Sequence, residues 1–305
     1  MIKKGGMNMK KWIIFALILM MFLVPGNLRG ASNRQNPSNA TNVELVKKVT
    51  IRAPQGKGKP SKTAATGTLG APCTGTKYAI VIGISDYPGT ANDLSYADDD
   101  ANVVKTTLID KYSFKDGNII LLIDMDASYS NIRNAINYLK DKVSASDEVV
   151  FFFSGHGARG TADDGDNEKT DEAIVSHNGS KLVPIWDGDL RNWFSDYKTS
   201  RIIFIFDSCL AGGMTDLASD GRIINMACSE NGVSYESPQW GGGHGQFTYY
   251  FAEEGMNLGK ADTYDHDGNP DTFDVTVEEA FDYASANCTL QKPVIRDQFI
   301  NDLFP

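Results

Sequence analysis

Apolar and polar positions follow two different patterns along residues 77–305. Five short runs are apolar and rich in β-branched or aromatic side chains, which predicts buried strands at 78–84, 118–123, 148–153, 202–206 and 221–227. Between these runs, apolar residues recur at helical spacing, which predicts helices at 97–111, 130–143, 187–197, 246–254 and 276–287. Strands alternating with helices are typical of a parallel sheet covered on both faces. The pattern therefore predicts an α/β three-layer sandwich with a mostly parallel central sheet.

We expect a single folded domain across residues 77–305, because no internal repeat interrupts this alternation. Between the third and fourth strands, a small hairpin is predicted around residues 173–175. The domain ends in an acidic carboxyl-terminal extension at about 257–305.

Residues 1–26 have the pattern of a Sec-type signal peptide. Four lysines precede an apolar run of 13 residues, 12–24, which is short of the roughly 20 residues that span a bilayer. We therefore expect an exported protein, either secreted or in the cell envelope. The cleavage site is not distinct, so an uncleaved membrane anchor is the alternative.

Residues 27–76 differ in composition from the rest of the chain. They are rich in Asn, Ser, Thr, Pro, Gly and Lys and show little apolar periodicity, which predicts a loosely held linker or pro-segment. This segment has eight basic residues and one acidic residue, Glu44. Since the whole chain carries −10 and residues 1–26 add four lysines, residues 77–305 carry −21. Such acidity argues against a nucleic-acid partner and favours basic ligands or cations.

Two of the predicted strands end in reactive side chains flanked by glycine. The strand at 202–206 leads to Asp207 and Cys209, and the strand at 148–153 leads to His156. Carboxyl ends of parallel strands share one edge of a sheet, where α/β proteins place their chemistry. A thiolate is a nucleophile, and a neighbouring imidazole can take the thiol proton. The histidine lies 53 residues before the cysteine, a spacing close to that in caspases.

Together, the motifs F-F-F-S-G-H-G and I-F-D-S-C-L-A-G-G closely resemble those of the caspase-like cysteine peptidases, in particular metacaspases and their bacterial relatives. The likeness covers about residues 77–256. It includes a first strand at 77–85, a counterpart of the family's N-D-A segment at 96–101, an acidic loop after the histidine and a late helix start at 245–250. This resemblance implies a caspase-hemoglobinase-like fold.

The resemblance also implies roles for individual residues. Cys209 would be the nucleophile and His156 the general base and acid, while the backbone N–H groups of Gly157 and Cys209 would form the oxyanion hole. Asp207 and Asp100 would line the primary specificity pocket. Two carboxylates in a pocket favour a guanidinium or an ammonium, which predicts cleavage after Arg or Lys.

One position departs from the family pattern. Asp99 stands where metacaspases usually have asparagine, so the sequence leaves open which of Asp99 and Asp100 points into the pocket. His244, in a glycine-rich run, is predicted to be a solvated loop residue.

Metacaspases are often calcium-dependent, and two acidic stretches carry the oxygen ligands that calcium prefers. The first contributes the candidates Asp163, Asp164, Asp166, Asp171 and Glu172. The second contributes Asp265, Asp267 and Asn269, but it departs from the EF-hand pattern because Gly268 comes too early. The alternatives are a solvated surface for the first stretch and a plain acidic turn for the second. The peptidase chemistry itself requires no cofactor.

The three cysteines other than Cys209 have different predicted roles. Cys73 and Cys288 lie near the two ends of the folded part and are candidates for a disulfide in an exported protein. Cys228 lies in an apolar stretch and is predicted to be a small buried side chain.

We therefore predict a cysteine endopeptidase that cleaves protein or peptide substrates after Arg or Lys through an acyl-thioester. The resemblance to metacaspases implies a monomer. The alternatives are a legumain- or clostripain-like peptidase, and a catalytically silent caspase-like module that binds peptides. The basic segment is either a flexible spacer or a pro-segment that lies in the acidic pocket until it is cut at Arg52, Lys57, Lys59 or Lys62.

Overall fold

The computed structural model describes residues 37–52, 63–165 and 168–305. The predicted signal peptide lies outside these residues, as do three of the four expected processing sites, Lys57, Lys59 and Lys62. Within the described ranges, no helix combines the length and apolarity needed to cross a membrane.

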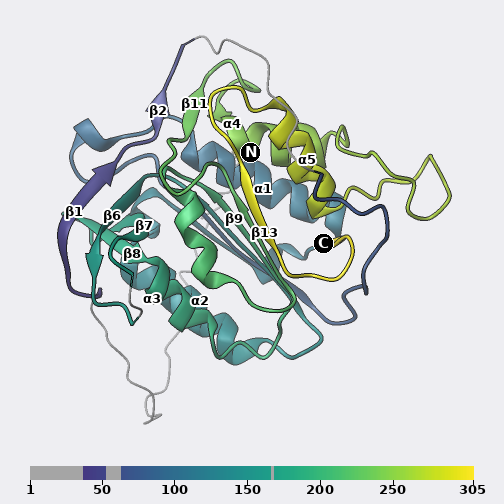
Figure 1. The fold of residues 1–305 in the computed structure, drawn as a ribbon, viewed down its shortest axis with the longest axis horizontal. Helices are drawn as coiled ribbons and strands as arrows, with labels where there is room; N and C mark the ends of the chain where they lie inside the picture. Colours follow the sequence, from purple (N-terminus) through teal and green to yellow (C-terminus); the bar gives the residue numbers. More distant parts are fainter. Residues whose placement is uncertain (1–36, 53–62, 166–167) are drawn as a thin grey trace, which may run out of the picture. The chain divides into compact units, whose positions relative to one another are not determined.

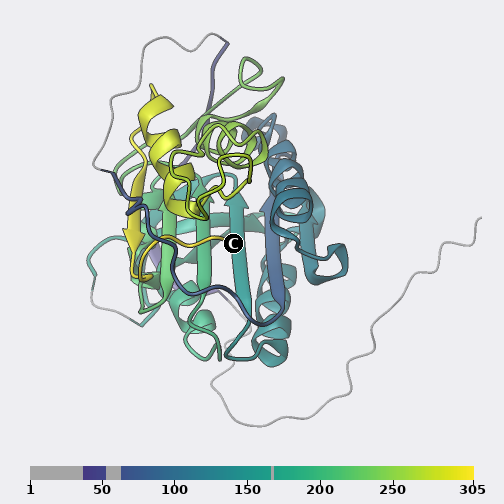
Figure 2. The same ribbon diagram turned by 90° about the vertical axis from the view of Figure 1, so that its right-hand side faces the viewer.

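A six-stranded sheet forms the centre of the fold, in the order β13-β10-β9-β5-β3-β4. Five of its strands are parallel, and each lies where an apolar run predicts a strand: β3 (Lys77–Gly83), β4 (Ile119–Ile123), β5 (Glu148–Ser154), β9 (Ile202–Asp207) and β10 (Arg222–Met226). The sixth, β13 (Val294–Asp297), is an antiparallel edge strand that the sequence pattern misses because it is short and only partly buried. Figure 2 shows these strands running side by side.

Helices cover both faces of this sheet, as the sequence predicts (Figure 1). Residues of α2 (Tyr129–Lys142) and α3 (Asp187–Phe194) pack on one face, against alternate strand residues such as Phe151 and Phe204. Residues of α1 (Ala97–Tyr112) and α5 (Val277–Asn287) pack on the other, against the intervening strand residues. The predicted helix at 246–254 becomes a short α4 (Gln246–Thr248) followed by a π-helical stretch, η5 (Tyr249–Asn257). The three-layer α/β sandwich is therefore confirmed.

Two smaller sheets lie beside the carboxyl edge of the central sheet and contain strands from the amino-terminal part of the chain. One is antiparallel, in the order β1 (Ala40–Val46), β6 (Gly157–Ala162), β7 (Asp171–His177) and β8 (Leu182–Trp186), and it includes the predicted hairpin. The other joins β2 (Val49–Thr50), β11 (Tyr235–Ser237) and β12 (His244–Gly245). Figure 1 shows β1 beside β6 and β2 beside β11. We call residues 37–52, which contain β1 and β2, the arm.

The described parts of the basic segment are therefore not loosely held, in contrast to the expectation from composition. The described residues belong to one compact unit. Beyond the arm, the backbone N–H groups of Ala64 and Ala65 donate to Asp282, and those of Thr66 and Gly67 donate to Asp302. These acceptors lie more than 200 residues away in the sequence, so local composition gives no sign of them.

All four thiols are free, so the disulfide considered between Cys73 and Cys288 is not formed. The Cys73 thiol lies 3.6 Å from the carbonyl oxygen of Ser146, whereas Cys288 is buried with its thiol 3.8 Å from the carbonyl oxygen of Gln246. Cys228 is buried, as predicted.

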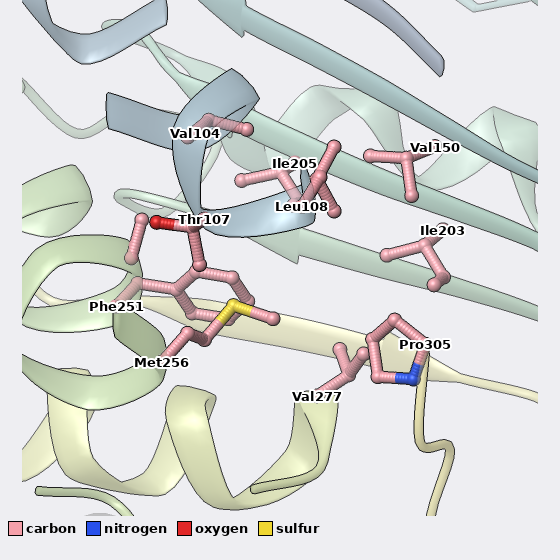
Figure 3. A pocket seen from close by; sticks show the side chains of 11 residues that line it. Val104, Thr107, Leu108, Val150, Ile203, Ile205, Phe251, Met256, Val277 and Pro305 are labelled. Carbon is pink, nitrogen blue, oxygen red and sulfur yellow. The ribbon is translucent and has the colours of Figure 1, made fainter. Parts of the chain in front are cut away.

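An apolar pocket lies between α1, η5 and the central sheet (Figure 3). Its lining includes Val104, Ile205, Phe251 and Met256, and the one hydroxyl on it, that of Thr107, donates to a carbonyl of its own helix. A ligand site needs a few convergent polar groups, which this lining lacks. The pocket is therefore a gap in the packing of the core.

Candidate active site

The ends of two neighbouring strands bring the predicted catalytic pair to one edge of the sheet. β5 and β9 are parallel, with Ser154 paired to Asp207, so His156 and Cys209 both follow directly at the carboxyl edge. Both side chains are about 1% exposed. The sheet register thus places the thiol and the imidazole that the two sequence motifs predict at the same edge.

Both ring nitrogens of His156 have hydrogen-bond partners. Nε2 lies 2.7 Å from the carbonyl oxygen of Asn92, and Nδ1 lies 3.1 Å from the backbone nitrogen of Lys48. The ring also stacks on Tyr87, with 4.7 Å between the ring centroids. Because an N–H donates to Nδ1, the ring is neutral here and its proton is on Nε2. Burial, together with the nearby Lys47 and Lys48, lowers the pKa of His156 to about 4.

Cys209 is a protonated thiol in this arrangement. Burial raises its pKa to about 11, and the amide of Ser234, which donates to Sγ at 3.2 Å, offsets only part of that effect. Its thiol does not hydrogen-bond to His156 among the described contacts. The site is therefore assembled from the predicted residues but holds its nucleophile in the unreactive form.

The predicted oxyanion hole involves two backbones in direct contact. A Cβ added to Gly157 would overlap the carbonyl group of Cys209, so only glycine fits there. Leu210, the next residue, has a φ of 61°, which turns the chain sharply after the nucleophile. The role of the Gly157 and Cys209 amides stays a prediction.

Asp207, predicted to line the specificity pocket, is fully buried beside the predicted catalytic pair. Its Oδ1 accepts a hydrogen bond of 2.6 Å from the hydroxyl of Ser234. Its Oδ2 accepts from the backbone nitrogen and the hydroxyl of Thr248, at 2.9 and 2.7 Å. Burial raises the pKa of Asp207, but the neighbouring Lys48 and these donors outweigh it, so the pKa lies below its usual value. The carboxylate is thus held ionised.

Asp100 supplies the second carboxylate of this pocket, and Asp99 points to solvent. Asp100 accepts from the hydroxyl of Ser154 at 2.7 Å and from the backbone nitrogen of Gly245 at 3.0 Å. His244 also contacts it, with Nδ1 3.1 Å from Oδ1. His244 is buried rather than solvated, contrary to the expectation from its glycine-rich surroundings.

A lysine of the chain itself occupies this pocket. The Nζ of Lys48 lies 2.9 Å from Oδ1 of Asp207, 3.4 Å from Oδ2 of Asp100 and 3.0 Å from the hydroxyl of Ser154. Its side chain is fully buried. Burial lowers the pKa of Lys48, but the two carboxylates outweigh this and raise it above its usual value.

From the sequence, four other basic residues are candidates for occupying the acidic pocket. Arg52 is exposed, and the other three lie outside the described residues. The overlooked signal is the run V-E-L-V-K-K-V-T-I, the one stretch of the basic segment with strand-forming residues on both sides of a lysine pair.

A cluster of acidic side chains follows His156 in the chain. Carboxylate oxygens of Asp164, Asp171 and Asp187 lie within 4.8 Å of one another, as do those of Glu168, Glu172 and Asp187. The sequence predicts three of these residues. It missed Asp187, the first residue of α3, and Glu168; Asp163 is exposed outside the cluster, and Asp166 lies outside the described residues.

Asp187 shows that this cluster fits a cation. The side chain is 1% exposed, and no hydrogen-bond donor among the described residues reaches its Oδ2. Burial and the neighbouring carboxylates raise the pKa of Asp187 to about 9, and they raise that of Glu172 to about 8. Several carboxylate oxygens at this spacing match the hard oxygen ligands of calcium.

The second acidic stretch has a different arrangement. Both oxygens of Asp267 accept from the hydroxyl of Thr272, at 2.9 and 2.8 Å, and Oδ1 also accepts from the backbone nitrogen of Asn269. Asp265 and Asp267 are not part of either acidic cluster found among the described residues. The structure therefore favours the plain acidic turn over a calcium loop here.

The α/β fold is caspase-like, and it brings a thiol, an imidazole and two buried carboxylates to one edge of its central sheet. Residues 77–218 match the model of the metacaspase, peptidase C14 domain. This part of the chain is therefore similar to metacaspase peptidase domains, as its motifs indicate.

Curated relatives agree with this assignment. The chain is 35% identical to metacaspase-7 of Arabidopsis thaliana over 152 residues, 47% of the chain and 37% of that protein. It is 35% identical to metacaspase-4 of the same plant over 172 residues, which are 53% of the chain and 40% of the relative. Metacaspase-1 of Cryptococcus neoformans is 32% identical over 174 residues, covering 54% of the chain and 38% of the relative. The match thus spans about two fifths of the length of these relatives.

A solved structure supports the fold. The crystal structure of protein GSU0716 from Geobacter sulfurreducens superposes with a TM-score of 0.53 at 15% identity, covering 75% of this chain and 95% of that one.

Proposed function

We propose that this protein is a cysteine endopeptidase that cleaves peptide bonds after lysine or arginine. The observation that carries the proposal is the Lys48 ammonium, buried between Asp207 and Asp100 beside the catalytic pair. The pocket thus accommodates a basic side chain, and the similarity of residues 77–218 to the metacaspase peptidase domain supports cysteine peptidase chemistry.

In the proposed reaction, His156 takes the thiol proton through Nδ1, and the Cys209 thiolate attacks the carbonyl carbon of the residue in the pocket. The resulting oxyanion is stabilised by the amides of Gly157 and Cys209. Collapse breaks the peptide bond, and His156 passes its proton to the departing amine. Water, deprotonated by the same imidazole, then hydrolyses the thioester and releases the acid product.

Charge explains the selectivity of the pocket. Asp207 is ionised and fully buried, so an uncharged side chain in the pocket would leave its charge without a counterion. A carboxylate of the substrate would place a second negative charge beside the buried Asp207, which would raise the free energy of the complex further. We therefore expect basic residues to be strongly preferred at this position.

The experiment compares three forms of the full chain: wild type, Lys48→Ala, and Lys48→Ala combined with Cys209→Ala. Each is offered peptide amides that end in Lys, Arg, Asn or Asp. Cleavage after Lys and Arg by Lys48→Ala, and its loss in the double variant, would support the proposal. Cleavage after Asn or Asp would keep the nucleophile but reject the basic pocket, in favour of a legumain-like specificity.

A second candidate function is a silent caspase-like module that binds peptides. The raised pKa of Cys209 favours it, since the thiol is unreactive as the structure stands. Binding of a Lys-ending peptide to the Lys48→Ala variant without any cleavage, in calcium and in chelator alike, would point to this alternative.

We also propose calcium as an activator that binds the Asp164, Asp171, Asp187 and Glu172 carboxylates. When bound, the ion would neutralise these charges. The side chain of Glu172 packs directly against Gly213, four residues after Cys209, so the order of this cluster bears on the loop that carries the nucleophile.

Export through residues 1–26 and a monomeric state remain part of the proposal. The proposal of export rests on the signal-peptide pattern of residues 1–26, and the proposal of a monomer rests on the resemblance to metacaspases. Sequencing the amino terminus of protein from the culture medium and from the cell envelope would test the first point.

A further inference from the structure

The arm contacts both the specificity pocket and the imidazole of the site. Lys48 fills the specificity pocket, and its backbone N–H donates to Nδ1 of His156. The next amide along the chain, that of Val49, donates to the carbonyl oxygen of Ser234 at 3.0 Å, and that of Ile51 donates to Glu236 at 2.9 Å. The direction of the chain through the site can therefore be read from these contacts.

A productive substrate has a fixed direction through such a site. The residue in the specificity pocket supplies the scissile carbonyl, so the departing nitrogen belongs to the residue that follows it. The imidazole must lie near that following nitrogen to protonate it. For a substrate with lysine in the pocket, His156 should thus face the amide after the lysine.

The arm shows the opposite arrangement. His156 faces the amide before Lys48, and the amide after Lys48 points away to the carbonyl of Ser234. The residues that follow Lys48 run parallel to β11, with Val49 paired to Tyr235. A chain of the reverse direction in the same groove would run antiparallel to β11 and would present the amide after its pocket residue to His156.

We propose that the arm is a reversed plug: it inhibits the peptidase by entering the active site backwards, so that the enzyme does not cut it. This inference rests on the proposed function. Lys48 blocks the pocket by charge, while its N–H occupies the Nδ1 lone pair that the imidazole needs as a base. The plug therefore disables both recognition and the proton transfer.

Anchors on both sides of Lys48 fix the direction of the plug. Before it, β1 pairs antiparallel with β6, up to Val46 opposite Gly157, and Ser38 donates to Asp189 at 2.7 Å. After it, β2 pairs with β11. A tethered segment held in this way competes with substrate at an effective concentration in the millimolar range. To turn around, it would have to lose both strands.

This geometry separates the plug from a pro-segment that the enzyme removes itself. A self-cut pro-segment has its scissile bond at the thiol and imidazole, with the pocket residue on the acyl side. Release of a reversed plug instead requires displacement of the arm, or a cut by another peptidase. Activation thus depends on something outside the catalytic cycle of this chain.

The test begins with the full chain, which carries the tethered arm. Wild type and Cys209→Ala are incubated for a day with calcium, and their intact masses and amino termini are compared. We expect no cut between residues 37 and 52 that depends on Cys209. A cut after Lys47 or Lys48 in wild type, absent in Cys209→Ala, would overturn the reversed direction.

A free peptide of residues 43–52 provides the matched control for sequence. In solution it can enter the groove in either direction, so we expect the Lys48→Ala enzyme to cleave it after its lysine pair. If the free peptide resists as well, the sequence rather than the direction protects the arm, and the proposal fails.

Inhibition is measured by activity and by binding. Lys48→Ala should raise kcat/KM for Lys-ending amides at least about tenfold over wild type. Lys47→Ala should not, because Lys47 is exposed and its ammonium donates to the carbonyl of Ala91, away from the pocket carboxylates. Equal kcat/KM in wild type and Lys48→Ala, with both active, would exclude a plug.

Binding separates this inference from the proposed function. In the Cys209→Ala background, a labelled Lys-ending peptide should bind at least about tenfold more tightly once Lys48 is also replaced. Val49→Pro provides a second variant, since it removes the donor to Ser234 and leaves the pocket unchanged. If both replacements tighten binding in the Cys209→Ala background but neither gives cleavage when Cys209 is present, the plug stands and the peptidase proposal falls. No gain in binding from either would overturn the plug.

Discussion

At the scale of single residues, the site is an arrangement of buried charges, each with a hydrogen-bond partner. Ser234 and Thr248 fix the two oxygens of Asp207, and Gly245 with Ser154 fixes Asp100. A Cβ on Gly245 would overlap the Asp207 carboxylate and approach the Lys48 ammonium, so a larger residue there would close the pocket. In the proposed function, specificity would therefore come from these preorganised carboxylates.

Replacing Asp207 with asparagine should remove the preference for basic residues. In the Lys48→Ala background, we expect kcat/KM for a Lys-ending amide to fall about 100-fold, since breaking a buried charge pair costs about 3 kcal/mol. Asp99→Asn is the control, because Asp99 is exposed beside the pocket and should leave kcat/KM unchanged. An Asp207→Asn enzyme with unaltered selectivity would contradict the role of this carboxylate.

The neutral state of His156 gives the stability of the fold a pH dependence. The pKa of His156 is lowered to about 4, against a usual value near 6.5, because the imidazole is buried, with Lys47 and Lys48 nearby. A lowered pKa means that stability is fully present above pH 6.5 and is lost as pH falls from there toward 4. We expect a loss of about 2 kcal/mol by pH 5.

Thermal unfolding between pH 7.5 and 5 measures this effect. His156→Gln is the matched variant, since glutamine stays neutral and still offers an acceptor and a donor. Wild type should lose more stability than His156→Gln across this range. Parallel pH curves for the two proteins would show that His156 does not titrate as argued.

At the scale of elements, the strands of the central sheet do most of the positioning. β5 and β9 carry the imidazole and the thiol to the same edge because their register pairs Ser154 with Asp207. α3 begins directly after β8 and thereby adds Asp187 to the acidic cluster. The stretch of chain from His156 to Gly213 thus carries both the acidic cluster and the predicted catalytic pair.

The elements also show what the sequence could reveal. Long apolar runs identify the five parallel strands, because a strand buried on both faces leaves a strong local signal. The catalytic pair and Asp207 were predictable for the same reason, since they directly follow such runs. β1 and β2 carry no such signal, because they are held mainly by backbone pairing to strands about 115 and 186 residues away. The sequence therefore did not predict that Lys48 enters the pocket or that His244 is buried, because the residues they contact are distant in the sequence and meet them only on folding.

Asp187 makes the proposed calcium site testable at this scale. We expect calcium to raise the melting temperature of the wild-type chain and to have little effect on Asp187→Asn. In chelator, Asp187→Asn should be at least as stable as wild type, because it removes a buried carboxyl from an acidic cluster. Asp163→Asn is the control, since Asp163 is exposed outside the cluster and should keep the calcium response. Equal responses in all three proteins would reject the site.

At the scale of the whole molecule, the contacts of the arm that stabilise the fold are the same contacts that would inhibit the peptidase. The arm covers the edge of β6, which would otherwise be an open strand edge, and it neutralises the pocket. The arm carries Lys47, Lys48 and Arg52 against Glu44, a net charge of +2 beside a domain of −21, and Lys48 makes the buried ion pairs with that domain. Removing the inhibitor should therefore also weaken the fold.

Lys48→Ala should lower the melting temperature at pH 7, because it leaves Asp207 ionised and buried with no ammonium beside it. A Lys-ending peptide should restore that stability by filling the pocket, with a gain of about 2.7 kcal/mol at 100 times its Kd. The measurement uses Cys209→Ala with and without Lys48→Ala, so that the peptide survives. Only the double variant should respond, and an Asn-ending peptide should stabilise neither protein. A response of the single variant equal to that of the double variant would mean that the pocket is open while Lys48 is present, and that the arm stabilises the fold without closing the site.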